Sequence, residues 1–431
     1  MFPKLPEELN ELIVSCLDLD DRQTLTAVCC TNRLGRRLAT PLMYRHVGAT
    51  EHGKGNRDML LCRTLLENPQ LCQYVEKINL LHYSEGNPSD PSIKSDVSKL
   101  LLDLHTQTRL PFYQSFLEWL SLGCDVYVSK VMLMVLAYNA QVIHIRGNHQ
   151  FLTWQKLLDT TIAAAVEARD TGATPPKLYG FTKIHTVKIS NHLAQLLPDV
   201  RDLCVLLALP ALQNLEIESL AASPDMHLGM ESRGPSTVQS LVIRDCRAKA
   251  DTLTGLFRLT PDLRRLSIRW SSRHDNYWRT DWRRIGRALT TLTPALEHLE
   301  FTHPIDDNFG VDQRESQGIA SGNALAATLA PLGSLKSLKS LQTLILSTIA
   351  LFGQHQTQDW PELDTVLPGS VEKLELLAKD IYLVGNDRLI VTDPYISRLQ
   401  NFIIYNCQKD RWITKDGEGA LPPKRPLRIF T

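Results

Sequence analysis

The sequence predicts an α/β fold in which a short, all-helical N-terminal module precedes a solenoid of alternating short strands and helices. Three observations predict it. One spacing of apolar residues returns in ten segments between residues 75 and 404, helix-compatible runs separate several of these segments, and residues 1–47 do not follow that spacing. A chain of 431 residues is too long for one small core, whereas a solenoid grows by stacking further repeats.

The recurring segment has an apolar residue followed, three and five residues later, by two more apolar residues. The last two lie two positions apart, so in a strand they point to one face, and the first closes the turn into that strand. This spacing is typical of leucine-rich repeats, in which each short strand pairs with the strand of the next repeat. The ten central apolar residues are Ile78, Ile143, Val187, Leu215, Leu241, Leu266, Leu299, Leu344, Leu374 and Phe402.

The distances between these central residues predict an irregular, horseshoe-shaped solenoid. From Val187 to Leu266 the steps are 28, 26 and 25 residues, close to the roughly 20–29 residues of a leucine-rich repeat. Steps of 33, 45 and 65 residues elsewhere predict inserted loops, or repeats whose strand the pattern does not reveal. The alternative is an ordinary α/β fold with amphipathic strands.

Helix-compatible runs precede several of the predicted strands and would pack on the convex side of the solenoid. They span residues 199–209, 249–260, 282–293 and 321–332. Cys246 and Cys407 follow their strands at the position where leucine-rich repeats place a turn-capping Asn or Cys.

Residues 1–47 predict three short helices, over residues 5–17, 18–32 and 33–47. Pro6 suits a helix start, and Asp20 or Asp21 suits the N-cap of the second helix. A segment shorter than about 50 residues buries too little surface to be robust alone, and no disulfide or metal pattern supports this one. Its apolar stripe must therefore pack against the first repeats, a partner protein, or both.

The helical module resembles the F-box family. The order and spacing of the matched residues cover the whole motif, although this chain has Arg33 and Leu34 where the family often has an aromatic residue. Residues 61–80 are similar to the segment that joins the F-box to the repeats in many fungal F-box proteins. The matched residues are Leu5, Pro6, Glu8, Leu9, Ile13, Leu17, Asp21, Leu25, Val28, Cys29, Arg33, Leu38, Ala39, Pro41, Leu42, Tyr44 and Arg45.

This resemblance implies a substrate-recognition subunit of an SCF-type cullin-RING ubiquitin ligase, in which the F-box binds a Skp-family adaptor and, through it, cullin. The predicted domains are an F-box at 1–47, a helical linker at 48–74, the solenoid at 75–409 and a tail at 410–431. The residues expected to contact the adaptor or to support that contact are Leu5, Pro6, Leu9, Ile13, Leu25, Val28 and Leu42.

Two alternatives stay open. The first is a non-catalytic F-box and leucine-rich-repeat scaffold that acts outside ubiquitin transfer, and the second is a hydrolase or transferase with an unrecognised site. The chain has no Gly-rich loop ending in GK[ST], no GxSxG elbow and no HExxH signature. We therefore expect no catalytic residue, no metal ligand and no cofactor.

Charge and composition give no reason to expect nucleic acid or a membrane as the partner. Lys and Arg together number 47, as do Asp and Glu, so nothing favours nucleic acid or an anionic membrane. No run of apolar residues is long enough to span a membrane, and the N-terminus does not read as a signal peptide. The nine cysteines form no CxxC pair and read as reduced thiols. We expect a cytoplasmic protein, a nuclear protein, or one found in both compartments.

The solvent-facing positions of the predicted strands would line the concave surface and bind a protein substrate. Arg244, Arg269 and Trp270 fall on neighbouring repeats. Arg and Trp are favoured at the energetic centres of protein interfaces, so these three residues are the predicted substrate-binding patch. A solvated surface without a ligand is the alternative.

Overall fold

The computed structural model divides into two compact units, Met1–Leu215 and Glu216–Thr431, and each is described separately. The structure describes residues 5–19, 21–48, 57–82, 95, 98–99, 101–103, 105–106, 113–121, 125–147, 161–162, 180–190, 200–220, 235–270, 281–302, 331–347, 350–351, 362–378, 401–406, 411–414 and 417–418.

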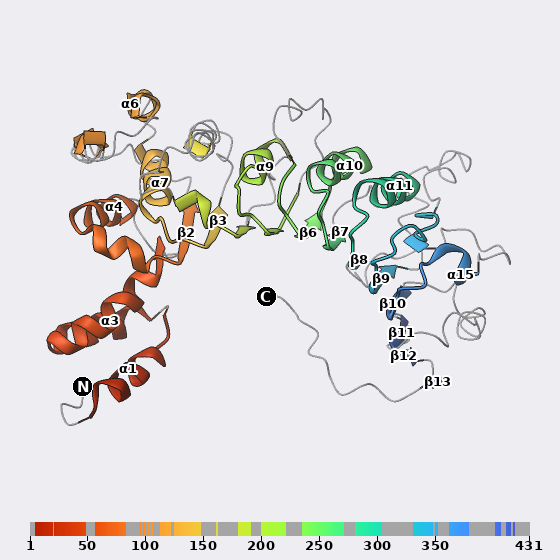
Figure 1. Cartoon of the computed structure of the whole chain (residues 1–431), viewed down its shortest axis with the longest axis horizontal. Helices are drawn as coiled ribbons and strands as arrows, with labels where there is room; N and C mark the ends of the chain where they lie inside the picture. The colour runs from red at the N-terminus through yellow and green to blue at the C-terminus, as the bar shows by residue number, and fades with distance from the viewer. Residues whose placement is uncertain are drawn as a thin grey trace, which may run out of the picture. The chain divides into compact units, whose positions relative to one another are not determined.

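The first unit opens with three helices and continues with strands separated by helical segments (Figure 1). The boundary between the units falls within β5. The elements are α1 (Glu7–Ser15), α2 (Arg22–Thr31), α3 (Arg33–Arg45), β1 (His46–Gly48), α4 (Arg57–Glu67), the 3-10 helix η1 (Pro69–Tyr74), β2 (Lys77–His82), α6 (Tyr113–Ser121), α7 (Asp125–Leu136), β3 (Val142–Gly147), the 3-10 helix η2 (Gly180–Thr182), β4 (Thr186–Ser190), α9 (Val200–Leu207) and β5 (Asn214–Ile217).

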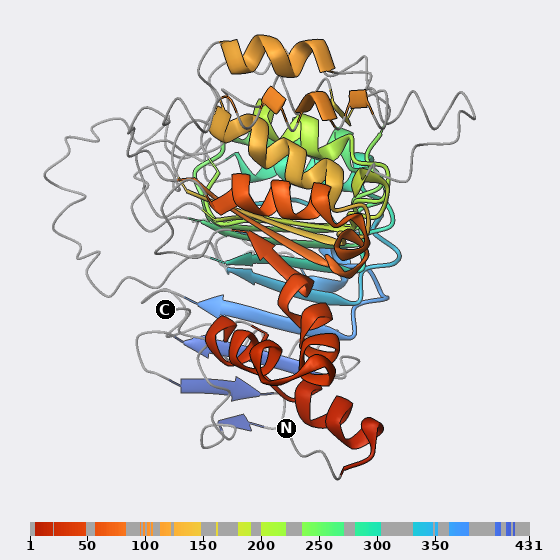
Figure 2. The same ribbon diagram turned by 90° about the vertical axis from the view of Figure 1, so that its left-hand side faces the viewer.

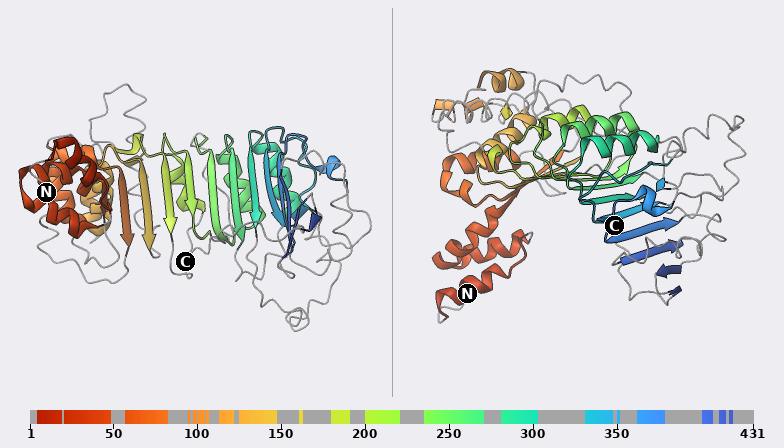
Figure 3. Two further views of the ribbon diagram at one scale, coloured as in Figure 1. Left: turned by 90° about the horizontal axis from the view of Figure 1, so that it is seen from below. Right: turned by 45° about the vertical axis from the view of Figure 1, so that its right-hand side comes forward.

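The second unit alternates strands and helices and ends in three strands; Figure 3 shows its strands lying side by side. The elements are β6 (Ser240–Cys246), α10 (Ala250–Leu259), β7 (Arg265–Trp270), α11 (Trp282–Leu292), β8 (His298–Thr302), β9 (Thr343–Ser347), α15 (Leu363–Val366), β10 (Lys373–Ala378), β11 (Asn401–Asn406), β12 (Arg411–Thr414) and β13 (Gly417–Glu418).

In both units the strands pair in chain order, mostly in parallel, so the fold is mixed α/β with parallel sheet. Parallel pairs join β1 through β4 in the first unit and β6 through β11 in the second. The central apolar residues predicted from the sequence lie opposite one another. Ile78 pairs with Ile143, and Ile143 with Val187. The second unit aligns Leu241, Leu266, Leu299, Leu344, Leu374 and Phe402 in the same way.

The inward side chains of the strands pack against the helices on one side. The helices α10 and α11 contact each other, and Figure 1 shows both on the same side of β6, β7 and β8. Trp270 of β7 packs against Trp282 of α11 and Phe301 of β8, with ring centroids 4.8 and 5.2 Å apart. All three rings are buried, and burying aromatic surface is a large stabilising contribution in such a core.

The helices predicted at 199–209, 249–260 and 282–293 correspond to α9, α10 and α11. The helix predicted at 321–332 falls outside the described residues except for 331 and 332, and Cys407 also lies outside them. Cys246 is buried at the end of β6, where it pairs with Trp270 and bridges to Leu220.

Two strand regions lie where the sequence predicted none. Val47 was assigned to the third helix, but it is the buried centre of β1 and pairs with Ile78. The predicted domain boundary after residue 47 therefore cuts a strand. The segment predicted as a C-terminal tail includes β12, which pairs antiparallel with β11 through Tyr405 and Trp412.

A buried pair of opposite charges lies where α4 packs against α7. Asp58 and Lys130 are both almost fully buried. Burial raises the pKa of Asp58, and the charge of Lys130 partly opposes this shift. Burial lowers the pKa of Lys130 to about 8, and Asp58 opposes that shift in turn. Removing one partner would leave the other charge uncompensated inside the unit.

We predict that Gly286→Ala destabilises the second unit by about 1–3 kcal/mol, because a new methyl group in a packed interior forces a backbone shift. A Cβ at Gly286 in α11 would overlap the backbone carbonyl of Leu332. Gly369→Ala is the matched control, because a Cβ there meets nothing within 4 Å. Urea denaturation followed by Trp fluorescence measures both variants, and equal midpoints would contradict this packing.

Candidate protein-binding surfaces

The N-terminal helical module, made of α1, α2 and α3, has a small apolar core. One buried residue from each helix forms its centre: Val14 from α1, Leu25 from α2 and Ala39 from α3. Half-buried residues pack around this centre, namely Leu17, Val28, Cys29, Leu38, Leu42 and Met43. With so few fully buried side chains, the module leaves much of its apolar surface outside its own core.

Side-chain hydrogen bonds cap α2 and α3 and stabilise the first turn of α1. The Asp21 carboxylate accepts a 3.0 Å bond from the backbone N–H of Thr24, as predicted for a residue that caps α2. Hydrogen bonds from Thr24 also lower the pKa of Asp21. The Asn32 side chain accepts a 2.8 Å bond from the N–H of Gly35 and caps α3. The amide of Asn10 donates to the carbonyls of Leu5 and Pro6, which holds the start of α1.

An exposed apolar row runs along α1. Leu9, Leu12 and Ile13 are 45%, 60% and 43% exposed. Their spacing of three and four residues puts them on one side of the helix, while Asn10 and Val14 face the module core. Three large aliphatic side chains in one exposed row are what a helix presents when a partner protein covers it.

The structure separates the predicted adaptor-binding residues into two groups. Leu9 and Ile13 are exposed on α1, Pro6 is exposed at its start and Leu5 is half-buried. The other three belong to the module core and so support the surface rather than form it: Leu25, Val28 and Leu42.

Leu12, which is the most exposed of the row, was absent from the predicted set. The sequence could have predicted the exposure of Leu12 with that of Leu9, because Leu12 lies three residues later on the same side of α1.

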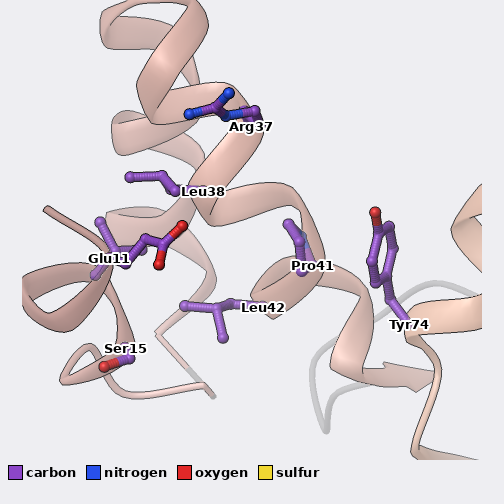
Figure 4. A pocket seen from close by; sticks show the side chains of 8 residues that line it. Glu11, Ser15, Arg37, Leu38, Pro41, Leu42 and Tyr74 are labelled. Atoms are coloured by element: carbon purple, nitrogen blue, oxygen red, sulfur yellow. The ribbon is translucent and has the colours of Figure 1, made fainter. Parts of the chain in front are cut away.

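A pocket of about 340 Å³ lies between α1, α3 and η1 (Figure 4). Leu38, Pro41 and Leu42 of α3 give it an apolar wall, and Pro41 has no N–H to donate to the helix there. The remaining lining residues are Glu11, Val14 and Ser15 of α1, Arg37 of α3 and Tyr74 of η1. Glu11 lies about 200° around α1 from Leu9, at about 100° per residue, so this pocket opens on a different side from the exposed row.

The helical module is joined directly to the first strands. The helix α3 ends at Arg45 and β1 begins at His46. The Arg45 carbonyl accepts a 2.9 Å bond from the N–H of Glu76, and the Arg45 side chain pairs with the Glu76 carboxylate at 2.6 Å. Since Glu76 immediately precedes β2, the module is attached to the sheet by backbone and side chain together.

The predicted substrate patch does not form a single surface. Trp270 is only 2% exposed and lies in the aromatic core, so it is not part of a binding surface; the alternation of β7 turns it inward together with Leu266 and Ile268. Arg269 is exposed on the opposite face of β7.

A bulge in β6 separates the two predicted arginines. The register between β6 and β7 shifts between Ile243 and Cys246, and Asp245 has a positive φ of 53°. Arg244, which lies in this bulge, pairs with Glu216 at 3.7 Å. Arg244 and Arg269 are therefore not register partners on neighbouring strands.

Paired charges mark the outward face of the second unit's strands. Glu300 of β8 accepts a 2.9 Å bond from Ser267, and the nearby His298 and Ser267 side chains lower the pKa of Glu300. Glu375 of β10 pairs with Lys373 at 2.7 Å. Each of these two carboxylates therefore already has a basic side chain beside it.

Across the described segments, no group of three or more His, Cys, Asp or Glu side chains is arranged to hold a metal ion. Among the same residues, no helix combines the length and the apolar character needed to cross a membrane.

No protein-family model and no curated protein matches the chain. The surfaces described above must therefore be interpreted from their own geometry.

We predict that Leu25→Ala opens the helical module whereas Leu12→Ala does not. Leu25 is fully buried, and removing a buried leucine side chain costs about 2–5 kcal/mol. Leu12 is exposed, so its truncation should change stability by about 0.5 kcal/mol or less. Hydrogen exchange of peptides from residues 7–45 measures the module separately from the rest of the chain. Equal protection in the two variants would contradict the assignment of Leu25 to the core.

Proposed function

We propose that this chain is the non-catalytic substrate-recognition subunit of an SCF-type cullin-RING ubiquitin ligase. The observation that carries the proposal is the exposed row of Leu9, Leu12 and Ile13 on α1, in a module whose residues match the F-box spacing. An F-box docks on a Skp-family adaptor, and this row would be buried in that contact.

The module's construction supports this assignment. Among its described residues the core contains three buried apolar side chains, Val14, Leu25 and Ala39, and a partner would supply the apolar contacts that the module lacks. Further apolar side chains line the pocket beside α3, which offers a partner side chain a second place to insert.

We further propose that the remainder of the chain is an irregular leucine-rich-repeat solenoid. The in-register alignment of one apolar position per strand supports it, as does the helix that precedes β7 and β8 in turn. Such a solenoid leaves the outward strand positions available to a protein substrate.

The mechanism of this subunit would be proximity. The F-box holds the adaptor, and the solenoid holds a substrate near the charged conjugating enzyme, which raises the effective concentration of the reacting groups. The Arg45–Glu76 connections between the module and β2 would limit rotation between the adaptor and the first strands. No bond is made or broken by residues of this chain.

We predict that Leu9→Asp combined with Ile13→Asp weakens binding to a purified Skp-family adaptor by at least 100-fold. Each substitution places a charge in a contact that would be desolvated, yet both positions are exposed in the free chain, so folding should be kept. Biolayer interferometry measures the affinity, and circular dichroism checks the fold.

Leu60→Asp is the matched control for this experiment. Leu60 lies on α4 outside the module and is 59% exposed, so this variant places one of the two negative charges on an exposed leucine without touching the proposed contact. Absence of adaptor binding by folded wild-type chain, or an equal loss with Leu60→Asp, would remove the F-box assignment. Point substitutions are preferable to deleting residues 1–47, because that deletion removes Val47 from β1.

We also predict that the chain, the adaptor, cullin and the RING subunit co-elute as one complex in size-exclusion chromatography. A receptor needs this assembly in order to bring a substrate to the conjugating enzyme. The scaffold alternative requires adaptor binding alone. Stable binding to the adaptor with consistent exclusion of cullin would therefore favour the scaffold over the ligase subunit.

A further inference from the structure

The helices α1 and α3 bring acidic and apolar side chains together at the pocket beside η1. The two helices contact each other, and Figure 2 shows both among the red helices of the helical module. Arg37 of α3 pairs with Glu7 of α1. About one turn further along each helix lie Glu11 of α1 and Pro41 of α3, and both line the pocket. An acid therefore recurs along α1, whereas α3 has an uncharged proline at the corresponding place.

The Glu11 carboxylate has no basic partner within the described part of the chain. No hydrogen bond or ion pair of the described residues involves it. Arg37, which also lines the pocket, is already paired with Glu7. Glu7, Arg37 and Glu11 together carry a net negative charge at neutral pH. The pocket therefore favours a cationic group over a neutral or anionic one.

Apolar side chains form the wall beside this carboxylate. Leu38, Pro41 and Leu42 of α3 are half-buried. In the view of Figure 4 the Glu11 carboxylate lies between Leu38 and Leu42, and Tyr74 lies beyond Pro41. The volume of about 340 Å³ is near the lower end of the roughly 300–1,000 Å³ of ligand pockets. The pocket thus suits one long side chain that is apolar along its stem and charged at its tip.

Ser15 supplies a second acceptor next to Glu11. It comes four residues after Glu11 in α1 and also lines the pocket, so both lie on the same side of the helix. The Ser15 hydroxyl donates a 2.8 Å bond to the carbonyl of Leu12, which occupies its proton and leaves its oxygen free to accept. A group with several N–H donors would therefore bond to Glu11 and Ser15 together.

We propose that this pocket binds an arginine side chain of a protein partner. The planar guanidinium would donate charge-assisted hydrogen bonds to the Glu11 carboxylate and a further bond to Ser15. Its methylene stem would pack against Leu38, Pro41 and Leu42. An aliphatic side chain would fill the same space but would desolvate Glu11 without giving it a partner.

This inference stands apart from the proposed function. The pocket opens on a different side of α1 from the exposed row of Leu9, Leu12 and Ile13. The protein that fills the pocket is therefore separate from the one that covers the row. The arginine site does not require the F-box assignment.

The probe is an acetylated and amidated Gly-Ala-Arg-Ala-Gly peptide, titrated into the full-length chain with carbon-13 in its Leu and Val methyl groups. We expect NMR shifts at Val14, Leu38 and Leu42, which line the pocket. A Kd of about 1–10 mM is expected, because one side chain buries little surface. The peptide with citrulline in place of arginine keeps the shape without the charge, and it should bind at least fivefold more weakly.

Glu11→Gln should weaken binding of the arginine peptide at least fivefold, because it removes the charge and keeps the size of the side chain. Glu118→Gln is the matched control. Glu118 is exposed on α6 outside the pocket, so this variant makes the same change in net charge and should alter the affinity less than twofold. Circular dichroism checks that both variants are folded.

Three results would overturn the proposal. The first is equal affinity for the arginine and citrulline peptides, and the second is an equal effect of Glu11→Gln and Glu118→Gln. The third is the absence of shifts at Val14, Leu38 and Leu42 when the peptide concentration is well above the expected Kd.

The double substitution Leu9→Asp and Ile13→Asp separates this inference from the proposed function. It should leave the affinity for the arginine peptide within twofold, because both positions lie on another side of α1 from Glu11. A fivefold or larger loss in this folded variant would overturn the separation of the two surfaces. Peptide binding by a wild-type chain that binds no adaptor would remove the ligase assignment and leave the arginine site standing. Adaptor binding without peptide binding would do the reverse.

Discussion

The carbonyl oxygen that comes immediately before a strand fixes the register on which both units depend. In the first unit the carbonyl of Glu76 accepts hydrogen bonds from the N–H groups of Gln141 and Val142. The carbonyl of Gln141 likewise accepts hydrogen bonds from the N–H groups of His185 and Thr186. In the second unit the carbonyls of Gln239, Arg264, Glu297 and Gln342 each accept two N–H groups from the next strand. Because side chains alternate along a strand, a shift of one residue would turn every inward leucine outward. One repeated hydrogen-bond arrangement therefore decides both the core and the exposed face.

The same arrangement explains how a marginal helical module is held in place. Arg45 ends α3, and its carbonyl accepts the N–H of Glu76, so the module is attached in front of β2 by a hydrogen bond of the same kind. Gly48 follows with a positive φ of 112°, and a Cβ there would overlap the backbone of Asn79. Only glycine allows β1 to approach β2 this closely. The module thus gains a rigid attachment while the outer row on α1 stays uncovered by its own core.

The register of the strands and the three N-terminal helices could be predicted because both follow from local periodicity. The alternation of side chains along β7 also predicts that Trp270 points inward, since it lies two residues after Ile268. The prediction that Trp270 belongs to a binding surface was wrong because it gave the residue type more weight than the position in the strand. Val47 was missed because a three-residue strand carries only one inward residue. The burial of Asp58 and Lys130 could not be predicted, because it depends on two helices that lie far apart in the sequence.

Net charge was uninformative for a related reason. Equal numbers of acidic and basic residues give no preference for a partner only when the two kinds are evenly distributed, and the strand register decides where each kind lies. On the second unit's described outward face, Glu300 lies near His298 and Glu375 near Lys373. The negative charge of each carboxylate is therefore offset by a basic side chain beside it. Electrostatic complementarity contributes to partner choice and encounter rate more than to raw affinity. The positions of the charges on the sheet, and not their sum over the chain, therefore decide what each part of the surface attracts.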